Sequence, residues 1–60
     1  MYEKYCKIRD SKNLTDYRVS KDTGITKSTF TEWKTGRSKP KVDKLKILAE
    51  YFGVKVEDLI

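Results

Sequence analysis

Apolar side chains recur at helical spacing along most of the chain, and strand-like alternation is hard to find. The clearest stripe consists of Val42, Leu45, Leu48, Ala49 and Phe52. Intervals of three and four place these side chains on one face of an α-helix. Because Gly53 follows the last of them, the pattern predicts a helix from about residue 42 to residue 52.

Two shorter helices are predicted upstream by the residues at their ends. Thr15 and Thr26 are typical N-cap residues, and Gly24 and Gly36 stand where the chain needs a positive φ after a helix. So little chain separates Gly24 from Thr26 that the two helices must meet at a steep angle. Residues 15–35 are therefore predicted to form a helix-turn-helix.

Two further segments complete the predicted fold. A first helix runs from about Tyr2 to Asp10, with Tyr5 and Ile8 facing inward, and a last short helix near EDLI buries Leu59. The prediction is an all-α fold of five short helices in one compact domain, residues 1–60. The expected core consists of Leu14, Val19, Ile25, Phe30, Trp33, Leu45, Leu48, Ala49 and Phe52.

The charged residues are unevenly distributed along the chain. The chain carries 14 Lys and Arg against 9 Asp and Glu, for a net charge of +5. Residues 23–46 alone hold seven basic and two acidic side chains, so the positive charge is concentrated in the middle of the chain. Such a patch suits a polyanion such as the DNA backbone, but it is equally consistent with a solvated surface that keeps the protein soluble.

Several function classes find no support in the residue types present. The chain has no histidine and a single cysteine, Cys6, so an intrachain disulfide is excluded and an activated thiol is not expected. No nucleophile–base pair or metal-ligand spacing is visible, so we expect no enzyme, metal, cofactor or small-molecule ligand. No apolar run approaches the ~20 residues of a membrane span, and the N-terminus is too polar for a signal peptide.

The helix predicted after Thr26 has two unlike faces. Phe30 and Trp33 face the core, and the opposite face carries Lys27, Ser28, Thr31, Glu32 and Thr35. Short hydroxyl side chains are mediocre helix formers, but they let a helix approach another surface closely. Lys27 can donate to guanine and Glu32 can accept from cytosine, so this face is a candidate for reading bases. An ion pair between Glu32 and a nearby lysine is the alternative.

Hydrogen-bond donors flank this helix on both sides. The backbone amides at its start near Thr26 can bind an anion. A basic segment that follows supplies further phosphate contacts, at Thr35, Arg37, Ser38, Lys39, Lys41 and Lys44.

The ordered set of these residues resembles the lambda-repressor-like helix-turn-helix domains, the Cro/cI-type (XRE) family. The pattern covers the chain from about Ile8 to Leu59. It comprises Leu14-Thr15, Val19-Ser20, Thr23-Gly24-Ile25-Thr26, Phe30, Trp33, Gly36, Pro40, Leu45, Leu48-Ala49 and Phe52-Gly53-Val54.

The resemblance implies a transcriptional regulator of a bacterium or phage, acting in the cytoplasm on double-stranded DNA, most often as a repressor. It implies base contacts in the major groove at Lys27, Ser28 and Glu32, and phosphate contacts at Thr29, Thr35 and the basic segment. It also implies a homodimer on a palindromic operator, with half-sites about one helical turn apart. A truncated domain would dimerise weakly.

Three positions depart from the family pattern. Asp16 stands where the family often has a phosphate-binding glutamine, and Tyr17 is expected to take over that contact through its hydroxyl. Lys34 stands where a glutamate often pairs with the arginine at position 9. Lys55 replaces a serine cap before the last helix.

A second hypothesis belongs to another class, a protein-interaction or antitoxin-like module. Ile47 and Tyr51 lie beside the main apolar stripe, and Ile60 ends the chain. These residues are predicted to form a partner surface, which in the regulator hypothesis is the dimer surface.

Overall fold

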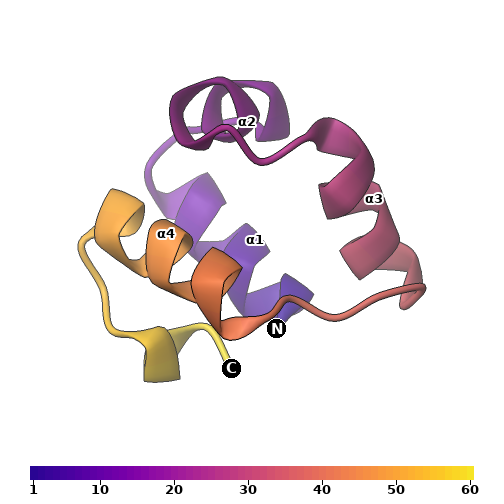
Figure 1. The fold of residues 1–60 in the computed structure, drawn as a ribbon. Helices are drawn as coiled ribbons and strands as arrows, with labels where there is room; N and C mark the ends of the chain where they lie inside the picture. Colours follow the sequence, from indigo (N-terminus) through magenta and orange to yellow (C-terminus); the bar gives the residue numbers. More distant parts are fainter.

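The chain folds into four α-helices and one turn of 3-10 helix in the computed structural model, which describes residues 1–60 (Figure 1). The elements are α1 (Tyr2–Ser11), α2 (Asp16–Thr23), α3 (Lys27–Thr35), α4 (Val42–Phe52) and η1 (Val56–Asp58). No strand is present, so the all-α prediction is confirmed. No helix combines the length and the apolar character that crossing a membrane requires.

The predicted ends of α2 and α3, and the predicted end of α4 before Gly53, are confirmed by their capping geometry. The hydroxyl of Thr15 accepts a hydrogen bond from the backbone N–H of Arg18 at 3.1 Å. The hydroxyl of Thr26 accepts one from the N–H of Thr29 at 3.3 Å. Gly24 follows α2 in the left-handed conformation, with φ of +81°, and the chain turns there toward α3. In Figure 1, α3 leaves the end of α2 in a new direction, which forms the predicted helix-turn-helix.

Aromatic side chains from three helices fill the centre of the core. Tyr5 of α1 stacks on Phe30 of α3 with ring centroids 5.0 Å apart, and Trp33 meets Phe30 edge-on at 5.3 Å. The buried residues are Tyr5, Val19, Ile25, Phe30, Trp33, Leu45, Leu48, Ala49, Phe52 and Leu59. α3 is therefore held to the core by its two aromatic residues, and its other face is left outside.

One member of the predicted core and one member of the predicted apolar stripe are less buried than expected. Leu14 is only half-buried, since it packs at the edge of the core between α1 and α2. Val42 was expected to begin the apolar stripe of α4, but 64% of it is exposed. Val42 is the first residue of α4, and the stripe reaches the core only from Leu45 onward.

The fifth predicted helix is a single 3-10 turn, so the predicted count of five helices is not confirmed. Its backbone bonds close over three residues: Asp58 N–H donates to Lys55 C=O at 3.0 Å, and Leu59 N–H donates to Val56 C=O at 2.9 Å. The carboxylate of Asp58 accepts from the N–H of Lys55 at 3.1 Å, which caps the turn without the serine expected there. Leu59 is fully buried, as predicted.

An aspartate near each end of α2 fastens this helix to a neighbour. Asp16 Oδ1 accepts from Tyr5 Oη at 2.6 Å and from Arg9 Nη1 at 2.8 Å, both on α1. Asp22 Oδ2 accepts from Tyr51 Oη of α4 at 2.5 Å and from Arg18 Nε at 2.9 Å. The first helix of the helix-turn-helix is therefore tied to α1 at one end and to α4 at the other.

Candidate nucleic-acid interface

The outward face of α3 is a row of polar side chains backed by the aromatic core. Lys27, Ser28, Thr31 and Thr35 are exposed, and Glu32 is half-buried. Phe30 and Trp33 point the opposite way and are buried. The structure therefore places all four predicted base-contacting residues and Thr35 on one helix, on the side away from the core.

The hydroxyls on this face differ in what they can offer a ligand. Thr31 Oγ1 donates to Lys27 C=O at 3.2 Å, and Thr35 Oγ1 donates to Thr31 C=O at 3.0 Å. Because both protons are engaged with the backbone, these two side chains present lone pairs and methyl groups outward. The hydroxyl of Ser28 makes no hydrogen bond within the chain, so it can donate as well as accept.

A hydroxyl pair sits at the start of α3. Thr26 Oγ1 and Thr29 Oγ1 lie 2.9 Å apart, and one of them donates to the other. The hydroxyl that accepts this bond keeps its own proton. One proton therefore remains at the N-terminal end of α3, where the helix dipole also favours an anion.

Glu32 has no basic partner within the chain. The three salt bridges join Arg9 to Asp10, Arg9 to Asp16, and Arg18 to Asp22. The alternative expected from the sequence, an ion pair between Glu32 and a neighbouring lysine, is therefore absent. A half-buried carboxylate without a partner, in the most basic part of the chain, is available to accept a hydrogen bond from a ligand.

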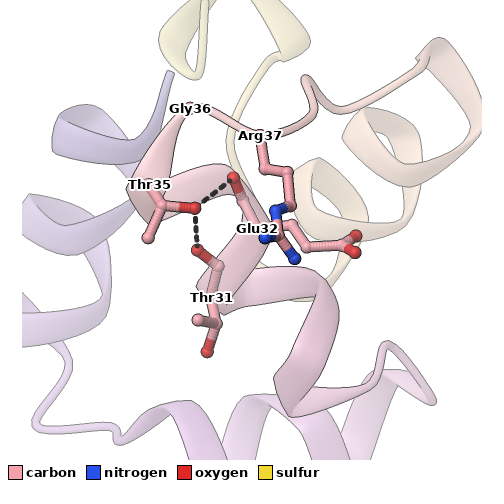
Figure 2. Close-up of a pocket in the computed structure, with 5 residues that line it drawn as sticks. All are labelled: Thr31, Glu32, Thr35, Gly36 and Arg37. Carbon is pink, nitrogen blue, oxygen red and sulfur yellow. Dashed lines mark hydrogen bonds between the residues drawn. The ribbon is translucent and has the colours of Figure 1, made fainter.

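Glu32 lines a shallow polar hollow at the end of α3. The hollow is lined by Thr31, Glu32, Thr35, Gly36 and Arg37, and none of these residues is hydrophobic. Figure 2 shows the side chains of Glu32 and Arg37 projecting from the same side of the helix end. All of the lining side chains belong to the sets predicted from the sequence to contact bases or phosphates.

Tyr17 and Lys27 meet across the turn between α2 and α3. The Lys27 ammonium lies 6.0 Å from the centroid of the Tyr17 ring, at the outer limit of a cation–π contact. Tyr17 is 61% exposed, and its hydroxyl has no hydrogen-bond partner within the chain. Its position beside α3 agrees with the phosphate contact expected for it.

Five of the predicted phosphate contacts lie in the segment between α3 and α4 or on the first turn of α4. Arg37, Ser38, Lys39 and Lys41 are exposed, and Lys44 on the first turn of α4 is half-buried. None of the four basic side chains forms a salt bridge, so their positive charge is uncompensated within the chain.

Asp16 does not present its charge freely at the start of α2. Partial burial opposes ionisation of its carboxyl group, but the hydrogen bonds from Tyr5 and Arg9 outweigh that effect and lower its pKa. Arg9, which has no glutamate at position 34, pairs with Asp10 and Asp16 instead. An aspartate at this position would repel a DNA phosphate, but the adjacent guanidinium of Arg9 offsets the charge of Asp16. Sequence reasoning missed this link, although the lone Arg9 without its usual partner was a signal for it.

The three residues of the predicted partner surface do not line one common groove in the structure. Ile47 is 37% exposed, and Tyr51 is half-buried with its hydroxyl donated to Asp22. Ile60 is exposed and lies along a groove formed with Met1, Tyr2, Trp33 and Leu45, among other residues. Neither Ile47 nor Tyr51 lines that groove.

The fold and the α3 face together define a helix-turn-helix domain whose second helix presents its polar side outward, next to a basic segment. Comparison with known proteins agrees with this class. The profile of the helix-turn-helix family matches residues 7–59, and the chain belongs to this family, which is of the XRE type. The match supports DNA-binding transcription regulation as the role of this family.

One similar curated protein is the HTH-type transcriptional activator BcrR of Enterococcus faecalis. It is 26% identical over 58 residues, which cover 97% of this chain and 28% of BcrR. The chain therefore spans less than a third of the length of that relative. No solved structure matches the chain.

Proposed function

We propose that this chain binds a specific sequence in double-stranded DNA and regulates transcription from that site. The observation that carries the proposal is the outward face of α3, where Ser28 and Glu32 have no partner within the chain. Hydrogen-bonding groups left free on a helix that fits the major groove are the usual means of direct base readout.

Within this proposal, Lys27, Ser28, Thr31 and Glu32 contact bases. Lys27 donates to guanine, Glu32 accepts from cytosine, and the outward lone pairs of Thr31 accept from an amino group. Phosphates are contacted on both sides of the groove. The proposed phosphate-contacting residues are Tyr17, Thr26, Thr29, Thr35, Arg37, Ser38, Lys39, Lys41 and Lys44.

The operator is proposed to be palindromic and bound by a homodimer. A small domain with a single reading helix covers only one half-site, and two copies double the contacts. The centres of the half-sites would then lie one helical turn apart, about 34–36 Å. Ile47, an exposed apolar residue on α4, is the proposed centre of the dimer contact.

The direction of regulation follows from where the operator lies. An operator that overlaps a promoter gives repression by occupancy, which is the mode we propose. The similarity to BcrR, which is named an activator, supports the alternative of a site upstream of the promoter.

Selection of binding sites from a random duplex library tests the proposal directly. We expect a palindromic motif from the wild-type chain at about 0.15 M salt, where non-specific affinity is low. The Lys27→Ala/Ser28→Ala variant should select a changed or weaker motif, because it lacks two groups that read bases. Lys55→Ala removes an equal charge between α4 and η1, outside the proposed contact residues, and should select the wild-type motif.

Circular dichroism confirms in each case that the variant is folded. If the folded wild-type chain enriched no motif even at concentrations that favour a dimer, base readout by α3 would be refuted. Pull-down with Ile47→Asp as the control would then test the protein-interaction alternative.

A further inference from the structure

Glu32 and Arg37 form an acceptor and donor pair at the end of α3. Gly36, in the left-handed conformation with φ of +77°, turns the chain back after the helix. The N–H of Arg37 then donates to the C=O of Glu32 at 2.9 Å. This bond holds Arg37 close to the last turn of α3, to which Glu32 belongs. Both side chains line the polar hollow in Figure 2.

The two side chains are near each other but are not joined by a salt bridge. The guanidinium therefore keeps its five donors, and the carboxylate keeps its acceptor sites. Thr31, Thr35 and Gly36 complete the hollow with small groups that leave both side chains accessible. The hollow thus offers a bidentate donor beside an acceptor, in a setting without apolar lining.

One base pair complements this pattern in the major groove. Guanine presents two acceptors, N7 and O6, and the cytosine paired with it presents the N4 amino donor beside them. An adenine–thymine pair offers only one acceptor on its purine, followed by a donor, so a bidentate arginine does not fit it. Arginine on guanine and a carboxylate on cytosine can therefore be satisfied on a single pair.

We propose that Arg37 and Glu32 together read one G·C base pair in each half-site. The proposal rests on the proposed function, but it reassigns Arg37 from the phosphate contact given there to base readout. Arg37 is then a specificity-determining residue located outside the reading helix, in the segment that follows it.

The first test compares the motifs selected by wild type, Arg37→Ala and Glu32→Ala. Neither side chain makes a hydrogen bond or salt bridge within the chain, so both variants should fold. We expect one G·C position of the wild-type motif to be relaxed in both variants, with the other positions kept. Lys39→Ala, which removes a proposed phosphate contact, is the matched control and should lower the affinity for all sequences alike.

The second test places 7-deazaguanine, which lacks the N7 acceptor, at that position of the selected duplex. The affinity of the wild-type chain should fall, but by less than the roughly 5- to 150-fold expected for loss of a whole bidentate contact, because the hydrogen bond to O6 is kept. The affinity of Arg37→Ala should not fall further on the modified duplex, because its partner for N7 is already absent.

Two results would overturn the proposal without touching the proposed function. In one, Arg37→Ala keeps the wild-type motif and loses affinity equally on all duplexes, as removal of a phosphate contact does. In the other, Arg37→Ala and Glu32→Ala relax different positions of the motif. A folded wild-type chain that selects no motif would refute the proposed function and this inference together.

Discussion

Asp16 shows how much a single side chain contributes at a junction of helices. The hydroxyl of Tyr5 lies on a fully buried residue, and a buried hydroxyl needs a partner. The Asp16 carboxylate provides that partner and also neutralises Arg9. One side chain therefore satisfies a buried phenol and compensates a guanidinium, and it caps none of the α2 amides with its own oxygens.

Stability in acid should report on this carboxylate. The pKa of Asp16 is lower in the folded chain than its unfolded value of about 3.9, so its contribution is complete above that pH. The contribution is lost as the pH falls through the lower, folded value. Urea unfolding of Asp16→Asn should therefore show a lower free energy of unfolding than wild type at pH 6, and a difference that shrinks as the pH falls below the unfolded pKa.

Asp43→Asn is the matched control, since Asp43 is exposed and makes no salt bridge. Its difference from wild type should change less over the same pH range. If the difference in free energy of unfolding between Asp16→Asn and wild type did not shrink in acid, a stabilising role of the Asp16 charge would be contradicted.

At the scale of helices, the ends of α2, α3 and α4 could be predicted because their signals are local. A threonine cap and a following glycine act within a few residues, and both operate as expected in α2 and α3. The segment after Val54 carried no such signal. Its one turn is set by the Asp58 carboxylate and by the burial of Leu59 against the rest of the fold, so its length could not be predicted.

The candidate site likewise has features that could be predicted from the sequence and features that could not. Periodicity alone separates the buried Phe30 and Trp33 from the outward face of α3, so that face could be predicted. The bonds of Asp16 to α1 and of Asp22 to Tyr51 could not, since the second joins residues 29 positions apart. The absence of an ion pair at Glu32 likewise depends on where long side chains come to lie.

The turn between α2 and α3 provides a test at this scale. A Cβ added at Gly24 would meet no atom within 4 Å, so Gly24→Ala creates no clash. Its φ of +81° is nevertheless unfavourable for alanine. We expect Gly24→Ala to lower the free energy of unfolding by about 1–2 kcal/mol.

Urea unfolding of Gly24→Ala and Gly24→Asn separates backbone strain from other effects. Asparagine tolerates the left-handed conformation better than alanine, so Gly24→Asn should lose less stability although its side chain is larger. The reverse order would show that crowding, rather than φ, determines the residue at this position.

For the whole molecule, charge placement matters more than the net charge of +5. Salt bridges pair charges on α1 and α2, where Arg9 and Arg18 bind aspartates, whereas Arg37, Lys39 and Lys41 have no acidic partner. Positive charge without an acidic partner therefore lies in the segment that directly follows α3. This arrangement suits a ligand whose own charge is continuous, as it is along a DNA backbone.

The salt dependence of DNA binding should report the number of phosphate contacts made by these basic side chains. For a selected duplex, Lys39→Gln and Lys41→Gln should each reduce the slope of log affinity against log salt by about 1. Lys55→Gln removes the same charge before η1 and should leave the slope unchanged. A slope that fell equally in all three variants would show that only the net charge matters.

The two aspartates of α2 also bear on the thermodynamics of recognition. Since α2 is bonded to α1 near its first residue and to α4 near its last, the helix that supports α3 is held at both ends without a ligand. A duplex would meet a reading surface in its final arrangement, and little conformational entropy of the protein would be lost on docking. The heat capacity change of association should then reflect the contact area alone, without a contribution from coupled folding.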